Sequence, residues 1–183
     1  MDSLQVSWVT EKGWEDAYEI FYRALKKLET EGKERFFGGM TPEGTKKSTK
    51  GENVLYLVYR KSDSLPVAAV SFVKDRSYQE YEDVVSKITK HPQKEKMAIL
   101  NAIAVRPELW GQGYARQSLE ICLRHLKLTG VSLLVGTVHP DNVSCIKTLK
   151  RVSDGCNVIM SDTYTWHTPR GRTLERRRFA FRI

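Results

Sequence analysis

The sequence contains few cysteines and no long apolar run, and both absences exclude classes of protein. Its three cysteines are odd in number and form no C-x-x-C pair, so we expect reduced thiols and a cytoplasmic protein: Cys122, Cys145 and Cys156. No apolar run approaches the roughly 20 residues that cross a bilayer. The first residues lack a positively charged segment followed by an apolar stretch. We therefore expect neither a membrane partner nor a secretory signal.

Motifs of several enzyme classes are also missing. The four histidines have no ligand spacing with one another or with the cysteines, so no metal site is expected: His91, His125, His139 and His167. The sequence has no G-x-S-x-G nucleophile elbow. It also has neither the G-x-x-x-x-G-K-[ST] loop of nucleotide triphosphatases nor the G-x-G-x-x-G of dinucleotide-binding folds.

Positive charge is abundant and unevenly placed. The 183 residues contain 30 Lys and Arg against 22 Asp and Glu, a net charge of +8. Residues 170–183 hold six arginines and one acid, Glu175, so this segment alone carries +5. Such a patch attracts phosphate, nucleic acid or acidic protein surfaces, although it can also be a solvated face.

The hydrophobic pattern predicts one α/β or α+β domain over residues 1–183. Alternating or continuous apolar runs predict strands at 4–10, 53–60, 66–74, 97–105, 131–138, about 156–166 and 173–182. Helical periodicity predicts helices at 14–28, 76–90, 115–126 and 142–151. Residues 31–50 are rich in glycine and lysine and predict a long, mobile, basic loop with a helical turn near 34–37. This order favours a mixed sheet flanked by helices.

The most informative stretch follows the predicted strand 97–105. Arg106-Pro107 begins a turn, and a loop with Gly111 and Gly113 then leads into a helix. Glycines allow a ligand to approach the backbone, and the free N–H groups at a helix start attract anions. The pattern predicts a cradle for a diphosphate.

These residues resemble the GNAT superfamily of CoA-dependent N-acyltransferases. The family signature is [QR]-x-x-G-x-[GA], and Gly113 and Ala115 match it in Trp110-Gly-Gln-Gly-Tyr-Ala115. Trp110 replaces the usual Gln or Arg, as in the branch that acetylates ribosomal-protein and other N-terminal amines. Asn142 before the helix 142–151 is similar to a second family segment, in which Cys145 takes the small position.

The resemblance implies a mostly antiparallel sheet of about seven strands with a splayed central pair. It also implies acetyl-CoA as co-substrate and no metal. The pyrophosphate would bind amides of about Gly111 to Arg116, and the pantetheine arm would run beside residues 99–105 and pair with the backbone of Ala102 to Val105. The residues implied to contact the co-substrate are Ala102, Ile103, Ala104, Val105, Trp110, Gly111, Gln112, Gly113, Tyr114, Ala115, Arg116, Asn142 and Cys145.

The acid and the base of the expected reaction are less well defined. Leu149 stands where the family commonly has a tyrosine. Asn142, Ser144 and His139 are the candidate catalytic residues, since each is expected near the cleft and His139 has a suitable intrinsic pKa. A helix cap for Asn142 and a surface turn for His139 remain alternatives. Cys145 is expected to be a small packing residue rather than a nucleophile.

Three hypotheses follow for the partner. The first is an acetyltransferase acting on an amine of a protein or small molecule, working as a monomer or a homodimer. The second is a related enzyme that modifies nucleic acid or aminoacyl-tRNA through the Arg-rich segment 170–183. The third is a CoA-binding module without catalysis. Period two in the last strand places Arg178, Ala180 and Arg182 opposite Phe179, Phe181 and Ile183, with the arginines outside the core.

Overall fold

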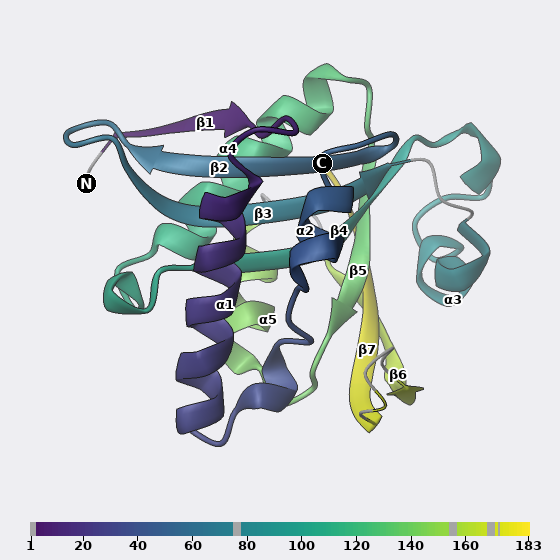
Figure 1. Cartoon of the computed structure of the whole chain (residues 1–183). Coiled ribbons are helices and arrows are strands. Elements are labelled where there is room, and N and C mark those ends of the chain that lie inside the picture. Colours follow the sequence, from purple (N-terminus) through teal and green to yellow (C-terminus); the bar gives the residue numbers. More distant parts are fainter. Residues whose placement is uncertain (1–2, 75–77, 154–156, 168–170, 172) are drawn as a thin grey trace.

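A seven-stranded mixed sheet runs through the molecule in the order β1-β2-β3-β4-β5-β7-β6 (Figure 1). The computed structural model describes residues 3–74, 78–153, 157–167, 171 and 173–183. The strands are β1 (Leu4–Trp8), β2 (Asn53–Arg60), β3 (Leu65–Lys74), β4 (Met97–Val105), β5 (Leu133–Val138), β6 (Ile159–His167) and β7 (Thr173–Arg182). All neighbouring pairs are antiparallel except β4 and β5. The expected single domain with a mixed sheet is confirmed.

Helices cover both faces of this sheet. The α-helices are α1 (Trp14–Thr30), α2 (Pro42–Lys47), α3 (Glu82–Val85), α4 (Tyr114–Leu128) and α5 (Val143–Val152). The 3₁₀ helices are η1 (Glu34–Phe36), η2 (Tyr78–Tyr81), η3 (Pro92–Lys94) and η4 (Pro107–Leu109). In Figure 1, α1 and α2 lie in front of the sheet, and α4 and α5 lie behind it. The sheet is therefore buried on both sides over its central strands, as its near-continuous apolar runs require.

Each face has its own hydrophobic core. Ile20 and Phe21 of α1 are fully buried against Leu55, Ala102 and other apolar side chains of the central strands. Behind the sheet, α4 packs through Leu119 and its apolar neighbours into a larger cluster that contains Phe72, Phe179 and Phe181. A third cluster joins α3 to β4, β5 and β7. The periodicity of α1 and α4 predicted these two buried faces correctly.

Two connecting segments differ from the sequence-based expectation. Residues 31–50 were expected as one loop with a helical turn, but Pro42–Lys47 forms α2, which begins where Thr41 Oγ1 accepts the N–H of Gly44 at 2.9 Å. The helix expected over 76–90 is much shorter, because α3 ends at Val85 and turns follow it. Tyr81, Val84 and Val85 are nevertheless buried, so the short helix still provides the expected apolar face.

The central strands β4 and β5 separate halfway along their length. Their parallel pairing joins Met97–Leu100 of β4 to Leu133–Gly136 of β5 and ends there. A register shift in the β3–β4 pairing leaves Asn101 opposite no residue of β3, which is a β-bulge next to the point of separation. The splayed strand pair that the family resemblance implied is therefore present, and it opens the sheet toward one end.

The Arg-rich strand β7 is only partly at the surface. Phe179, Ala180 and Phe181 are all buried, so both faces of the strand enter the core. Arg182 is exposed and Arg178 half-buried, as expected, but Ala180 on the same face is buried, and Arg176 is only 4% exposed. Cys156 and residues 168–170, between the strands predicted at about 156–166 and 173–182, lie outside the described residues.

Candidate active site

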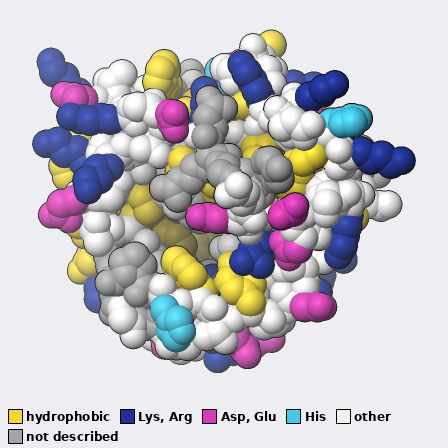
Figure 2. All heavy atoms as spheres, turned by 90° about the vertical axis from the view of Figure 1, so that its right-hand side faces the viewer, with side chains coloured by type: hydrophobic (Ala, Val, Ile, Leu, Met, Phe, Trp, Pro, Cys, Tyr) yellow, Lys and Arg dark blue, Asp and Glu magenta, His cyan; other side chains and the backbone are white. Residues whose placement is uncertain are grey.

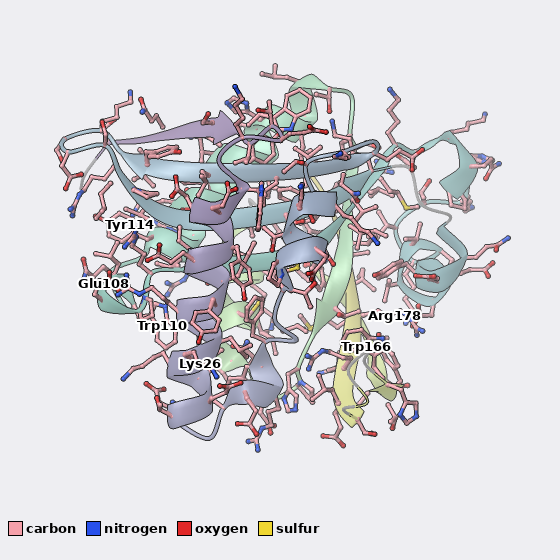
Figure 3. All side chains as sticks on the ribbon, viewed as in Figure 1. Lys26, Glu108, Trp110, Tyr114, Trp166 and Arg178 are labelled. Carbon is pink, nitrogen blue, oxygen red and sulfur yellow. The ribbon has the colours of Figure 1, made fainter. Side chains whose placement is uncertain are left out.

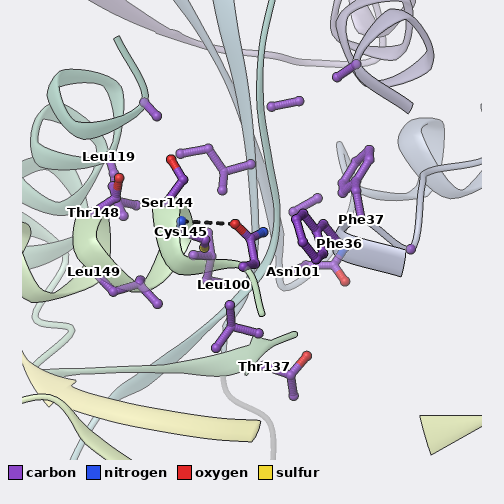
Figure 4. A pocket seen from close by; sticks show the side chains of 18 of the residues that line it. Phe36, Phe37, Leu100, Asn101, Leu119, Thr137, Ser144, Cys145, Thr148 and Leu149 are labelled. Atoms are coloured by element: carbon purple, nitrogen blue, oxygen red, sulfur yellow. Dashed lines mark hydrogen bonds between the residues drawn. The ribbon is translucent and has the colours of Figure 1, made fainter. Parts of the chain in front are cut away.

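A pocket of about 1670 Å³ fills the opening between β4 and β5. Phe36 and Phe37 lie on one side of it, Ser144 and Cys145 on the other, and Asn101 between them (Figure 4). The pocket extends from the glycine loop before α4 to the strands β6 and β7. One cavity therefore connects the predicted anion cradle with the far end of the sheet.

The glycine loop presents unpaired backbone donors to this pocket. Gly111 and Gly113 have φ values of 79° and 83°, a conformation that other residues adopt only with strain. Gly113 is the N-cap of α4 and has no side chain to cap it. Gln117 donates to the Gly113 carbonyl at 3.2 Å, and the N–H groups of Ala115 and Arg116 have no acceptor among the described residues. These N–H groups are therefore free to donate to an anion.

The start of α1 shows why the start of α4 is suited to an anion. Gly13 also caps its helix in the left-handed conformation without a side-chain hydrogen bond. The first turn of α1, however, carries Glu15 and Asp16, which already complement the helix dipole. The first turn of α4 has no acid and contains Arg116. A phosphate group would therefore be favoured at α4 and not at α1.

The edge of β4 supplies the second part of the site. Arg106 donates its N–H to the Val67 carbonyl at 2.9 Å, so alternation along the strand turns the backbone groups of Ile103 and Val105 away from β3 and toward the opening. Ala102 and Ala104 line the pocket but direct their backbone groups to β3. Of the residues Ala102 to Val105 that were expected to pair with the pantetheine arm, Ile103 and Val105 are therefore the two whose backbone groups point toward the opening.

Trp110 holds the glycine loop against this edge. Its indole N–H donates to the Val105 carbonyl at 2.8 Å, and its ring packs against both main hydrophobic clusters. Figure 3 places Trp110, Glu108 and Tyr114 together at the turn between β4 and α4. The Val105 carbonyl therefore already accepts the Trp110 indole N–H, and the backbone N–H of Val105 is the group that remains for a ligand.

The start of α5 forms the wall opposite the glycine loop. Asn142 Oδ1 accepts the N–H of Cys145 at 3.1 Å, so this side chain caps the helix. Burial raises the pKa of the Cys145 thiol to about 11, which keeps it neutral near pH 7. Ser144 is exposed and lines the pocket. Leu149 is buried in the core. Because its side chain has no ionisable group, this position supplies no acid.

His139 lies outside the set of residues that line the pocket. It is only 3% exposed, and its Nδ1 accepts the N–H of Asp141 at 3.1 Å. That hydrogen bond places the proton of the neutral ring on Nε2, so neither nitrogen offers a free lone pair. Burial, helped by the nearby Arg176, lowers the pKa of His139. This placement does not support the expected role as general base.

The lowered pKa of His139 predicts how stability depends on pH. The unfolded chain binds a proton near the ordinary pKa of 6.5, whereas the folded chain resists it, so stability is lost as pH falls below 6.5. His139→Asn should therefore show a smaller loss of unfolding free energy than the wild type between pH 7.5 and 5. Urea unfolding across this range measures the difference. Parallel pH curves for the two proteins would contradict the prediction.

The remaining walls of the pocket come from the segment after α1 and from the last two strands, which the family resemblance implied for the acceptor groove without identifying individual residues. Phe36 and Met40 follow α1, Tyr164 and Trp166 belong to β6, and Arg176 belongs to β7. Arg176 Nη1 donates to the Arg35 carbonyl at 2.9 Å, which joins two segments 141 residues apart in sequence. The only sequence signal was the shared face of Arg176 and Arg178 in the predicted strand. All thirteen co-substrate contacts expected from the resemblance, and Ser144, line this same pocket.

Comparison with known proteins agrees with this geometry. A family model described as Acetyltransferase (GNAT) family matches residues 14–153. The match spans most of the chain, and the protein therefore belongs to the GNAT acetyltransferase family. A sequence comparison with curated proteins gave no match.

Solved structures show the same fold at low sequence identity. The ribosomal-protein-S18-alanine N-acetyltransferase from Escherichia coli is 19% identical with a TM-score of 0.64, over 99% of this chain and 94% of that chain. A ribosomal L7/L12 alpha-N-protein acetyltransferase in complex with coenzyme A is 14% identical with a TM-score of 0.66, over 99% and 94%. An N-acetyltransferase from Staphylococcus aureus Mu50 is 7% identical with a TM-score of 0.65, over 98% and 97%.

No group of three or more His, Cys, Asp and Glu side chains in the described part of the chain is arranged to hold a metal ion. Among the described helices, none combines the length and the apolar character that crossing a membrane requires.

Proposed function

We propose that this protein transfers an acetyl group from acetyl-CoA to a primary amine by direct attack in a ternary complex. The observation that carries the proposal is the meeting of an uncapped, acid-free helix start and a free strand edge in one pocket. A diphosphate at the first and an extended arm along the second match the two ends of an acyl-CoA.

The residues of the glycine loop and β4 would hold the co-substrate. The amides of Ala115 and Arg116 would donate to the phosphates, and the absence of side chains at Gly111 and Gly113 leaves space for them. The exposed edge groups of Ile103 and Val105 would pair with the amide-containing arm as a neighbouring strand would. This geometry directs the acyl end into the opening between β4 and β5.

Acetyl-CoA supplies an activated thioester carbonyl for the amine to attack. The chain contributes mainly by holding both reactants in line, which removes much of the entropic barrier. The Ser144 hydroxyl lies at the start of α5, facing the pocket, where it can donate to the departing thiolate. Burial keeps the Cys145 thiol protonated and makes it a poor nucleophile, which favours direct attack over an acyl-enzyme. The His139 ring is buried and already accepts the N–H of Asp141. The proton of the acceptor's ammonium group therefore leaves through water in the open pocket.

Ser144→Ala should reduce kcat by about tenfold, since a hydrogen bond to a developing anion contributes about 1.5 kcal/mol. KM for acetyl-CoA should stay within about twofold, because Ser144 lies away from the phosphate cradle. Ser86→Ala, whose hydroxyl only bonds the Glu82 carbonyl, is the matched control and should leave kcat unchanged. Steady-state release of free CoA measures both variants. An unchanged kcat in Ser144→Ala would remove this residue from the mechanism.

The structure weakens the case for nucleic acid as the partner. Arg178 pairs with Asp83 at 3.7 Å, Arg182 pairs with Glu95 at 2.9 Å, and Arg176 is buried. On the face in Figure 2, Lys and Arg side chains are dispersed and acidic side chains lie among them. The described part of the Arg-rich segment therefore lacks the continuous basic surface that phosphate backbones favour.

Turnover of acetyl-CoA with a panel of amines, compared with bulk tRNA and DNA, tests the proposal. We expect free CoA to appear only when an amine acceptor is added. Transfer to tRNA or DNA would establish the nucleic-acid alternative instead. Binding of acetyl-CoA without turnover on any acceptor would favour the non-catalytic module.

A further inference from the structure

Arg176 is a buried cation inside the pocket. It is 4% exposed, and it lines the pocket at the end away from the glycine loop. Its Nη1 donates to the carbonyls of Arg35 and Glu175 at 2.9 and 3.0 Å. Its Nε and Nη2 make no hydrogen bond to any described residue, so one edge of the guanidinium has two donors in a fork.

No Asp or Glu among the described residues lies within 4.0 Å of the Arg176 guanidinium. Its neighbours on the same strand differ in this respect, since Arg178 faces Asp83 and Arg182 faces Glu95. Burial accordingly lowers the pKa of Arg176. A buried charge without a counter-ion is costly, and a ligand anion would offset that cost.

Aromatic side chains surround this cation. The Arg176 guanidinium lies 5.7 Å from the centre of the Trp166 ring, and Arg178 lies 4.2 Å from the centre of the Tyr164 ring. Figure 3 shows Trp166 and Arg178 at the end of the molecule formed by β6 and β7. Phe36 forms the facing wall, from the segment after α1. This end of the pocket thus combines one unpaired positive charge with apolar surfaces.

We propose that the acceptor is a small primary amine that carries a carboxylate, with Arg176 binding the carboxylate and the aromatic walls contacting an apolar body. The inference rests on the proposed acetyl transfer and names the class of its acceptor. A carboxylate fits better than a phosphate, because one guanidinium with a free two-donor edge matches the charge and planar geometry of a single carboxylate. Free amino acids with apolar side chains have this chemistry.

Matched pairs of acceptors test the inference without any variant. Phenylalanine and phenethylamine, tryptophan and tryptamine, and leucine and isoamylamine each differ only by the carboxylate. We expect kcat/KM for the amino acid to exceed that for its partner by about 30-fold, because a site built around a buried charge rejects analogues that leave it unpaired. Equal values within the pairs would overturn the inference.

Variants of β7 separate recognition from a purely structural role. Arg176→Met should abolish the preference for the carboxylate and change kcat/KM for phenethylamine by less than about threefold. Arg176→Lys should retain part of the preference, because it keeps the charge and loses the fork. Arg177→Met is the matched control: Arg177 donates to the Ser161 carbonyl at 2.9 Å and does not line the pocket, so the preference should remain.

The outcomes distinguish this inference from the proposed function. An equal loss with both members of a pair in Arg176→Met would show that Arg176 only maintains the fold, and would overturn the inference. Transfer to amines that lack a carboxylate, and not to amino acids, would overturn it while the proposed function stands. If no amine accepts acetyl from bound acetyl-CoA, the proposed function fails and the inference fails with it.

Discussion

A tryptophan in place of Gly113 is expected to lower the affinity for acetyl-CoA by at least about 100-fold, or about 2.7 kcal/mol, while the fold is retained. A Cβ at this position would meet only the Gln117 amide, at 3.7 Å, so the indole extends into the open space before the helix start. That space is where the phosphates would contact the amides of Ala115 and Arg116. Isothermal titration with acetyl-CoA measures the loss.

Gly13→Trp is the matched control for this experiment. Gly13 also caps a helix with a positive φ, 89°, and has nothing within 4 Å of an added Cβ. Both substitutions therefore carry a similar backbone strain of about 1–2 kcal/mol, but Gly13 does not line the pocket. Affinity should stay within about threefold in Gly13→Trp. Equal affinities in the two variants would show that the glycine loop is not the cradle.

Gly136→Leu is expected to destabilise the protein by about 3 kcal/mol or more. A Cβ on Gly136 would lie 2.7 Å from Phe179 Cζ and 3.1 Å from the Leu100 carbonyl oxygen. Phe179 is 1% exposed and cannot move aside without disturbing the core. Gly136 is also the last residue of β5 that pairs with β4, so the missing side chain lets the two strands meet just before they separate. Urea unfolding measures the change.

Two further variants show whether the clash is the cause. Thr137→Leu changes the next residue, which is exposed, and should cost less than about 0.5 kcal/mol. Gly136→Ala should cost about 1–3 kcal/mol, and less in a Phe179→Leu background, where the facing ring is absent. Unfolding midpoints of Gly136→Leu equal to the wild type would contradict the packing described here.

The parts of the fold that depend on local sequence were predictable. The glycine loop could be located because Gly111 and Gly113 stand between an apolar strand and an amphipathic helix, and their positive φ values follow from the turn between these elements. The strands β2, β4 and β7 have the predicted bounds, and β2 and β4 were predictable because their apolar runs are long and uninterrupted. The apolar residues of 76–90 also predicted burial correctly for Tyr81, Val84 and Val85, although Tyr81 lies in η2 and only the other two in the four-residue α3.

The end of the pocket that we propose binds the acceptor depends on contacts that no local pattern contains. Arg176 becomes a pocket residue because β7 is placed next to the segment after α1, and the Arg35 carbonyl binds it there. The sequence shows that Arg176 and Arg178 share a face of the strand. It does not show that Asp83 pairs with Arg178 and not with Arg176. Asn142 and His139 were expected near the cleft, but no local pattern shows that the His139 ring is buried and accepts the N–H of Asp141, or that Asn142 Oδ1 accepts the N–H of Cys145.

The most direct test of acetyl transfer by direct attack uses radiolabelled acetyl-CoA with and without an amine acceptor. The account predicts label in the acetylated amine alone, and no label retained on the protein when the amine is omitted, because Cys145 is a neutral thiol and Ser144 only donates a hydrogen bond. Label bound covalently to the protein without an amine, or an amine left unlabelled while acetyl-CoA is bound, would contradict it.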